Sequence, residues 1–174
     1  MNQMPERIQM LSLEVRETSG FEAWIPDGSE QSVLGLGLWL KDQAKARELT
    51  EEDRQQIGII DDNPLNEWIA RTHIEMSAKT YSYSIDSGMY FGEIIRTRHP
   101  ATAWRIGSKP KRGVNYNRPV VATEDDYFII DPVGWIANSL HGYLLYRHGV
   151  PGYASARNFD LLRDLHERER HIQR

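Results

Sequence analysis

The sequence contains no cysteine among its 174 residues. That absence excludes thiol nucleophiles, disulfide bonds and cysteine-based zinc sites. No stretch approaches the ~18 consecutive apolar residues that a membrane-spanning helix requires. The first residues also lack the basic segment and apolar run of a secretory signal. We therefore expect a cytoplasmic protein that does not enter a membrane.

The usual signatures of a catalytic or metal site are also missing. The sequence has no G-x-S-x-G motif, and the glycines of 35–37 complete neither common nucleotide-binding loop. His73 and Glu75 fall in a segment that reads as helix, where side chains two residues apart diverge by about 200°. His141 and His148 lie about 10 Å apart along a helix, too far to share one ion. We predict no metal and no cofactor.

Positive charge is scarce overall but locally concentrated. The net charge of -4 disfavours nucleic acid as a partner. The stretch from Arg96 to Arg118, however, contains seven Lys or Arg residues and no acid. Aromatic side chains are interleaved with these cations, as in many binding surfaces. The candidate binding residues are Trp104, Arg105, Lys109, Lys111, Arg112, Tyr116 and Arg118.

The hydrophobic pattern changes between helical and alternating spacing along the chain, which predicts an α+β fold. We expect one domain over residues 1–155, followed by a partly frayed C-terminal helix over 156–174. The predicted antiparallel sheet comprises Ile8–Val15, Trp104–Ile106, Pro119–Ala122 and Tyr127–Ile130. The predicted helices lie near residues 31–47, 64–79, 84–96 and 132–147, with an irregular join at 81–84.

Several single residues define the ends and contacts of these elements. Ser29 is an expected N-cap, and Asp131-Pro132 is a typical helix start. Asn63-Pro64 gives the same signal. Pro100 should end the helix before it. Gly92 has no side chain and should allow its helix to approach the sheet closely.

Glu93 is a polar residue in an otherwise apolar segment. A carboxylate that faces inward needs a partner, and Arg96 or Arg105 can supply one. A structural Glu–Arg pair is the favoured interpretation. The alternative is an enzyme site assembled from distant residues, for which the candidates are Glu93, His99, Arg105 and Asp131.

The segment Tyr90–Arg96 (YFGEIIR), with Trp104, the later Arg118–Val121 strand and Asp131-Pro132, resembles a group of small uncharacterised bacterial α+β proteins. In that group a helix with a Gly-Glu pair leads into a Trp-bearing strand, a second strand and a closing helix. Similar layouts occur in small proteins that neutralise toxins. The resemblance implies a fold rather than an activity, and it assigns no catalytic residue.

Two functional hypotheses remain from the sequence. The first is a non-enzymatic module that binds another protein through the basic residues and exposed aromatics, with toxin neutralisation as one example. The second is a small-molecule-binding protein or an enzyme whose site joins the four distant residues. The lack of an assembled catalytic motif favours the first.

Overall fold

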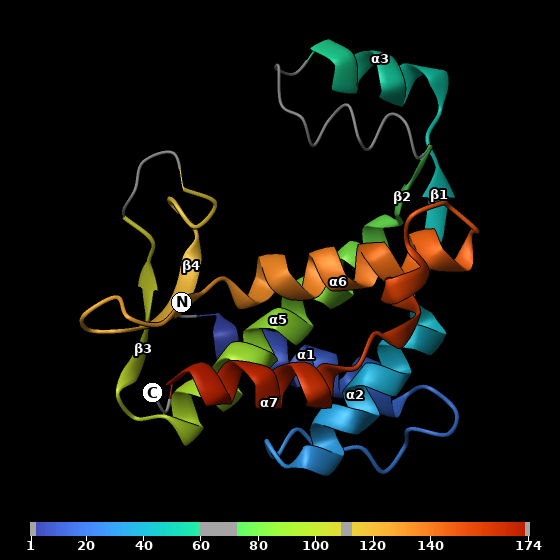
Figure 1. The fold of residues 1–174 in the computed structure, drawn as a ribbon. Helices are drawn as coiled ribbons and strands as arrows, with labels where there is room; N and C mark the ends of the chain where they lie inside the picture. The colour runs from blue at the N-terminus through green and yellow to red at the C-terminus, as the bar shows by residue number, and fades with distance from the viewer. Residues whose placement is uncertain (1–2, 60–72, 109–112, 173–174) are drawn as a thin grey trace.

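The computed structural model describes residues 3–59, 73–108 and 113–172. As the sequence predicts, these residues form an α+β fold in which small antiparallel sheets pack against helices (Figure 1). The helices are α1 (Met4–Arg16), α2 (Glu30–Gln43), α3 (Glu51–Ile59), α5 (Ala78–Arg98), α6 (Pro132–Arg147) and α7 (Leu161–Ile172), with a 3-10 turn at Ala154–Asn158. The strands are β1 (Ala46–Glu48), β2 (Ile74–Met76), β3 (Thr102–Ile106), β4 (Pro119–Thr123) and β5 (Ile129–Ile130).

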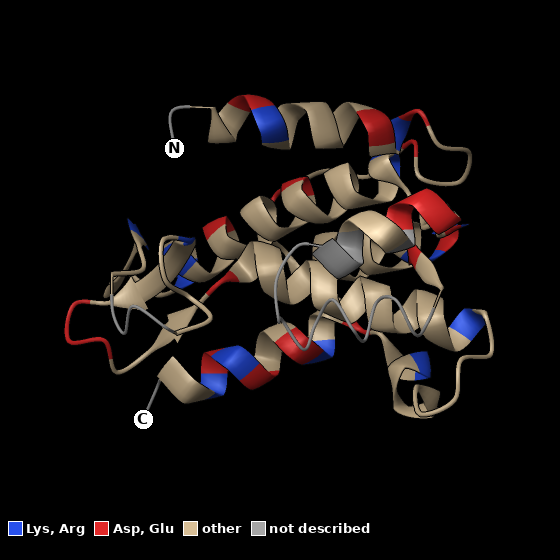
Figure 2. Ribbon diagram, turned by 90° about the horizontal axis from the view of Figure 1, so that it is seen from above, with Lys and Arg blue, Asp and Glu red and all other residues tan. Residues whose placement is uncertain are grey.

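The 21-residue helix α5 is the centre of the molecule. Helices α1, α2, α6 and α7 all pack against it, and Figures 1 and 2 place α1 and α7 on its opposite sides. Figure 2 also shows that charged residues gather on α7, whereas the central helices are mostly uncharged. The largest fully buried side chains include Trp39, Phe91, Ile95, Leu140 and Leu165.

The N-terminal segment is a helix, so the predicted strand over Ile8–Val15 is wrong. Leu11 and Val15 are fully buried, while Met10 and Leu13 are exposed. Buried positions four residues apart match the period of a helix, whereas a strand would bury alternate residues. Leu11 and Val15 therefore mark the buried face of a helix. The additional exposed apolar residues hide this helical spacing in the sequence.

Polar contacts also fix α1 on α5. Arg7 Nε donates to Asp86 Oδ1 at 2.6 Å, and the Tyr83 hydroxyl donates to Glu14 Oε2 at 2.9 Å. Burial raises the pKa of Asp86, and the guanidinium of Arg7 partly offsets that effect. Helix α1 is thus attached to α5 along most of its length.

The main sheet has the strand order β3-β4-β5, and both pairs are antiparallel. The predicted strands at Trp104–Ile106 and Pro119–Ala122 are confirmed. The third, predicted over Tyr127–Ile130, forms a ladder only at Ile129–Ile130. Its first part is a turn, because Thr123 Oγ1 accepts from the Phe128 N–H at 3.0 Å and Asp125 Oδ1 accepts from the Tyr127 N–H at 3.0 Å.

Two glycines of α5 permit close contacts, as predicted for Gly92. A Cβ at Gly92 would lie 2.2 Å from Trp104 Cζ2, and one at Gly88 would lie 2.5 Å from the Cα of Val133. The absence of a side chain at Gly92 therefore leaves room for the tryptophan of β3. The absence of one at Gly88 leaves room for the first turn of α6.

The region around residues 64–84 differs from the prediction. Residues 60–72 lie outside the described residues, and with them most of the helix expected at 64–79. Residues Ile74–Met76 form strand β2, which pairs with β1. The join expected at 81–84 is also wrong, because α5 runs without interruption from Ala78. Ser77 caps it by accepting from the Thr80 N–H at 3.2 Å.

The helix predicted near 31–47 ends at Gln43, and Ala46–Glu48 forms strand β1 instead. The Thr80 hydroxyl accepts from the Lys45 N–H and donates to the Lys45 carbonyl, so the backbone leaves the helix there.

The predicted caps agree with the structure wherever they are described. Ser29 Oγ accepts from the Ser32 N–H at 3.1 Å, and Asp131 Oδ1 accepts from the Gly134 N–H at 2.8 Å. Helix α5 ends at Arg98, two residues before Pro100. None of the helices in the described part of the chain combines the length and apolar character needed to cross a bilayer.

Candidate functional site

Trp104 and Glu93 form a structural unit at the junction of β3 and α5. The indole Nε1 of Trp104 donates to Glu93 Oε1 at 2.6 Å. Arg96 Nη2 donates to Glu93 Oε2 at 2.9 Å, and its Nε also reaches the carboxylate. The predicted Glu–Arg pair is confirmed, with Arg96 as the partner. Glu93 thus attaches the tryptophan of β3 to α5, and Arg96 of the same helix neutralises its charge.

Arg105 and Arg118 each have a carboxylate partner. Arg105 pairs with Asp126, and its Nη2 donates to the Thr123 carbonyl at 2.5 Å. Arg118 Nη1 lies 3.2 Å from Asp131 Oδ2, and the same aspartate caps α6. These arginines therefore tie the β3–β4 hairpin to the turn before β5 and to α6.

The described part of the basic stretch is largely neutralised. Four of its arginines pair with acids: Arg96 with Glu93, Arg98 with Glu169, Arg105 with Asp126 and Arg118 with Asp131. The predicted residues Lys109, Lys111 and Arg112 lie outside the described residues. Tyr116 is exposed on the connection between the strands. The sequence predicts only the pair of Arg96 with Glu93; the acids of the other three pairs lie 13 to 71 residues from their arginines.

The four candidates for an assembled enzyme site each have a different partner. Glu93 pairs with Arg96, Arg105 with Asp126, and Asp131 with Arg118. His99 Nε2 lies 3.5 Å from Glu169 Oε1. No described interaction joins any two of the four, so the structure does not bring them together as one catalytic set.

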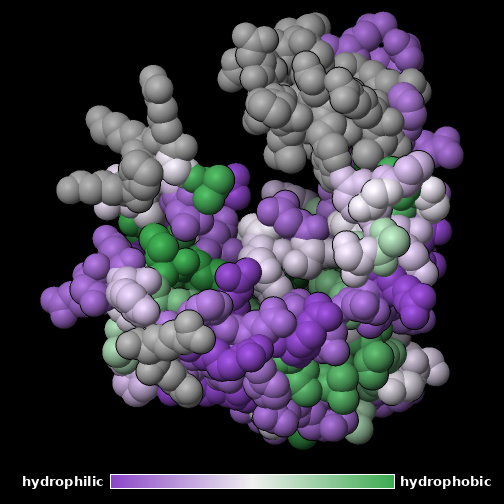
Figure 3. Space-filling view, in the orientation of Figure 1, coloured by the Kyte–Doolittle hydropathy of each residue, from purple (hydrophilic) through white to green (hydrophobic). Residues whose placement is uncertain are grey.

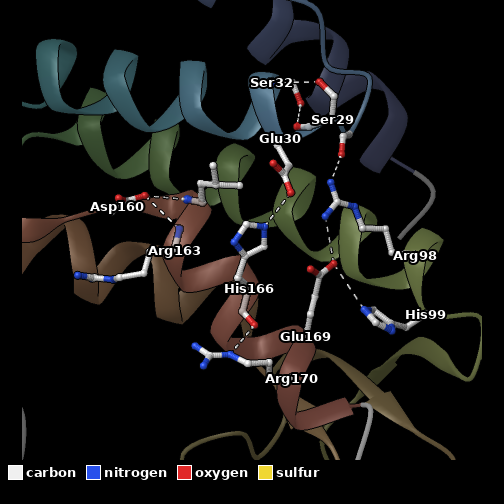
Figure 4. A network of polar contacts seen from close by, with 12 residues as sticks. Ser29, Glu30, Ser32, Arg98, His99, Asp160, Arg163, His166, Glu169 and Arg170 are labelled. Atoms are coloured by element: carbon white, nitrogen blue, oxygen red, sulfur yellow. Dashed lines mark hydrogen bonds and ion pairs between the residues drawn. The ribbon is translucent and has the colours of Figure 1, made fainter.

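His99 belongs instead to a network that attaches α7 to the rest of the molecule (Figure 4). Arg98 Nη1 donates to Glu169 Oε1 at 3.1 Å, and its Nη2 donates to the Gly28 carbonyl at 2.5 Å. One turn earlier on α7, His166 Nε2 lies 3.0 Å from Glu30 Oε1. These contacts join α7 to the end of α5 and the start of α2.

A groove of about 850 Å³ lies between the start of α1, one face of α5 and strand β3. We call it the β3 groove. Its apolar walls come from two methionines, three aliphatic residues, a proline and a tryptophan, and Gln3 and Arg7 add polar atoms. The apolar residues are Met4, Ile85, Met89, Trp104, Ile106, Pro119 and Val133.

The β3 groove exposes apolar surface that the fold does not cover. The Ile106 side chain is 53% exposed although it belongs to a sheet, and Met4, Ile85 and Met89 are only half-buried. Figure 3 shows the face of the molecule on which α7 lies, where hydrophobic side chains gather at the base of the β3–β4 hairpin beside hydrophilic surface along α7. The start of α1, which forms one wall of the groove, lies on the other side of α5. Apolar side chains that remain exposed in a groove can contact a ligand or a partner. Flexible methionines adapt such a surface to a partner.

A second cleft, of about 740 Å³, lies along α6. We call it the α6 cleft. Arg118, Asp131, Asn138 and His141 contribute polar atoms to it. Asp131 and Arg118 are paired with each other, and His141 Nε2 lies 3.3 Å from the Ile74 carbonyl. Burial lowers the pKa of His141. In the α6 cleft, Asp131 and Arg118 therefore stabilise the start of α6, and His141 packs against β2. They do not converge on one point as a reactive set would.

Sequence reasoning found only one residue of the β3 groove, Trp104. Met4 precedes the strand predicted over Ile8–Val15, and its place in the groove depends on the helix α1 that forms instead. Sequence reasoning missed Ile85 and Met89 because apolar residues four apart on a helix are normally assigned to the core.

The comparisons with known proteins identify no relative: no protein-family model, curated protein or solved structure matches this chain. Among the described residues, no group of three or more His, Asp or Glu side chains could hold a metal ion.

Proposed function

We propose that this protein is a binding module that recognises another protein through the β3 groove. The observation that carries the proposal is the exposed apolar wall formed by Ile106, Met4 and Met89 beside the ring of Trp104. Burying one such side chain against a partner contributes about 1.5–3 kcal/mol. Tryptophan and methionine are enriched where partners bind.

The basic stretch supports the choice of partner. It contains seven cations, of which four have carboxylate partners within the described residues. The other three, Lys109, Lys111 and Arg112, lie in the sequence that connects β3 to β4, which contains no acid and therefore carries an excess of positive charge. A partner with acidic residues near its apolar contacts is favoured by this excess.

The test is selection of linear peptides from a random displayed library on the wild-type protein. Binding of the enriched peptides is then measured for Ile106→Asp, which places a charge in the groove. Leu38→Asp is the matched control, because Leu38 of α2 is about as exposed as Ile106 but neither lines the groove nor belongs to the basic stretch. We expect more than about tenfold weaker binding for Ile106→Asp and no change for the control. Equal binding by both variants, or no enriched peptide, would contradict the proposal.

A further inference from the structure

The hydrogen-bond register of β3 determines which of its backbone groups face away from the sheet. The Gly107 N–H donates to the Arg118 carbonyl at 2.9 Å, and Ile106 stands opposite Pro119, which has no N–H to donate. Backbone groups alternate in direction along an antiparallel strand. Ala103 and Arg105 therefore bond to β4, whereas the N–H and C=O groups of Trp104 and Ile106 point to the other side.

The ladder between β4 and β5 supports the same register. The Thr123 N–H donates to the Phe128 carbonyl at 3.0 Å, so Thr123 and Val121 face β5. Val120 and Ala122 must then face β3 and bond to Arg105 and Ala103.

The outer edge of β3 has no partner strand among the described residues. The strand order β3-β4-β5 leaves β3 at the end of the sheet. The Thr102 N–H is satisfied by the His99 carbonyl at 2.8 Å, but no described backbone bond involves the amides of Trp104 or Ile106. Natural edge strands are usually protected by lysine, proline or a bulge. Strand β3, with the sequence TAWRI, contains neither lysine nor proline. Its only charged residue, Arg105, pairs with Asp126.

The β3 groove reaches this strand from one face of the sheet, where Trp104 and Ile106 of β3 and Pro119 of β4 line it. Trp104 and Ile106 share one face of β3, because alternate side chains of a strand point the same way. Both line the groove, and the start of α1 forms its far wall. A strand placed next to β3 would hydrogen-bond to the outward amides and carbonyls. Every second side chain of that strand would enter the groove.

We infer that the partner binds by adding an extended segment to the outer edge of β3, with apolar residues at alternate positions and acidic residues around them. This inference rests on the proposed function and specifies its mode of binding. Backbone hydrogen bonds then supply affinity, and the apolar pockets supply sequence preference.

The charge of the basic stretch favours a different protein over a second copy of this chain. Four of the seven cations in each stretch are paired with acids, but pairing of two β3 edges would place side by side two molecules whose β3–β4 connections each contain Lys109, Lys111 and Arg112 and no acid. Like charges placed side by side oppose association. The same positive charge attracts an acidic segment and favours its association.

Amide hydrogen exchange tests the inference with the peptide that the library selection yields. Trp104 and Ile106 should exchange on the order of tenfold more slowly when the peptide is bound. Ala103 and Arg105 are the internal control, since their amides already bond to β4. If the peptide binds in the groove without protecting Trp104 and Ile106, strand addition is wrong and the proposed function stands. Protection that depends on protein concentration without peptide would indicate self-pairing and also overturn it.

A second measurement separates the backbone from the side chain. Ile106→Pro removes both the side chain contact and the outward N–H, whereas Ile106→Ala removes only the former. The β3–β4 ladder does not use this N–H, so both variants should fold. Loss of one hydrogen bond should weaken peptide binding by Ile106→Pro about 2–10-fold relative to Ile106→Ala. Equal affinities would refute the inference, and the exchange experiment decides it if the proline variant does not fold.

Discussion

Replacement of Gly92 by alanine should destabilise the protein strongly, although alanine favours helices. The new Cβ would lie 2.2 Å from Trp104 Cζ2, 2.5 Å from Cη2 and 3.0 Å from Pro132 Cγ. The indole cannot move freely, because its Nε1 donates to Glu93 at 2.6 Å. The ring must shift and break this hydrogen bond, or the contact between α5 and β3 must widen.

The magnitude follows from three contributions. Overpacking of a core contact costs about 1–3 kcal/mol. Loss of a hydrogen bond to a charged group costs about 1.5–3 kcal/mol. The gain in helix propensity returns about 1 kcal/mol. The free energy of unfolding should therefore fall by about 1.5–5 kcal/mol.

Urea denaturation followed by tryptophan fluorescence provides the assay. Gly142→Ala is the matched control, because its Cβ would meet only Ala156 Cβ at 3.5 Å, an ordinary contact. It lies inside α6 and should gain up to about 1 kcal/mol. The two substitutions should thus shift the midpoint in opposite directions. Shifts of the same sign and size would refute the argument.

A double-mutant cycle identifies the cause of the loss. Trp104→Phe removes Cζ2 and Cη2, the two atoms closest to the new methyl group. Gly92→Ala should then cost at least about 1 kcal/mol less in the Trp104→Phe protein than in the wild type. An unchanged cost would assign the effect to another contact.

Two further predictions concern α6. Asp131→Ala should lower the free energy of unfolding by about 0.5–2 kcal/mol, because it removes the side chain that caps Gly134. Asp131→Asn should retain most of this stability, since asparagine also caps helices. Equal losses for the two variants in urea denaturation would exclude a capping role. Burial lowers the pKa of His141 below its ordinary 6.5, so the unfolded chain binds a proton more readily than the folded protein. The stability that His141 contributes is therefore present above pH 6.5 and is lost as the pH falls through the folded-state pKa. The advantage of wild type over His141→Gln should shrink on acidification, and a constant difference would contradict this.

The sequence predicts those parts of the fold that depend on local signals. Ser29 and Asp131 cap helices, Pro100 lies just beyond the end of α5, and Gly92 seats a neighbouring ring. Each of these depends on the backbone preference or size of one residue type. Such features can be inferred from a residue and its nearest neighbours along the chain.

The sequence does not predict features that depend on distant partners. The sequence predicts a strand over Ile8–Val15 because its five apolar residues alternate weakly, and only contact with α5 selects Leu11 and Val15 as the buried pair. The acids that neutralise the basic stretch come from three other segments. The β3 groove requires α1 to lie beside β3, which no local pattern encodes.

The glycine pair of α5 restricts how this protein can diverge. Gly88 meets the backbone of Val133 and Gly92 meets the ring of Trp104, so neither position accepts even a methyl group without movement of a neighbour. Descendants of a common ancestor that keep this architecture should retain G-x-x-x-G here while their surfaces change. Aligning candidate homologues on this motif and the tryptophan that follows should recover kinship that average sequence identity no longer reveals.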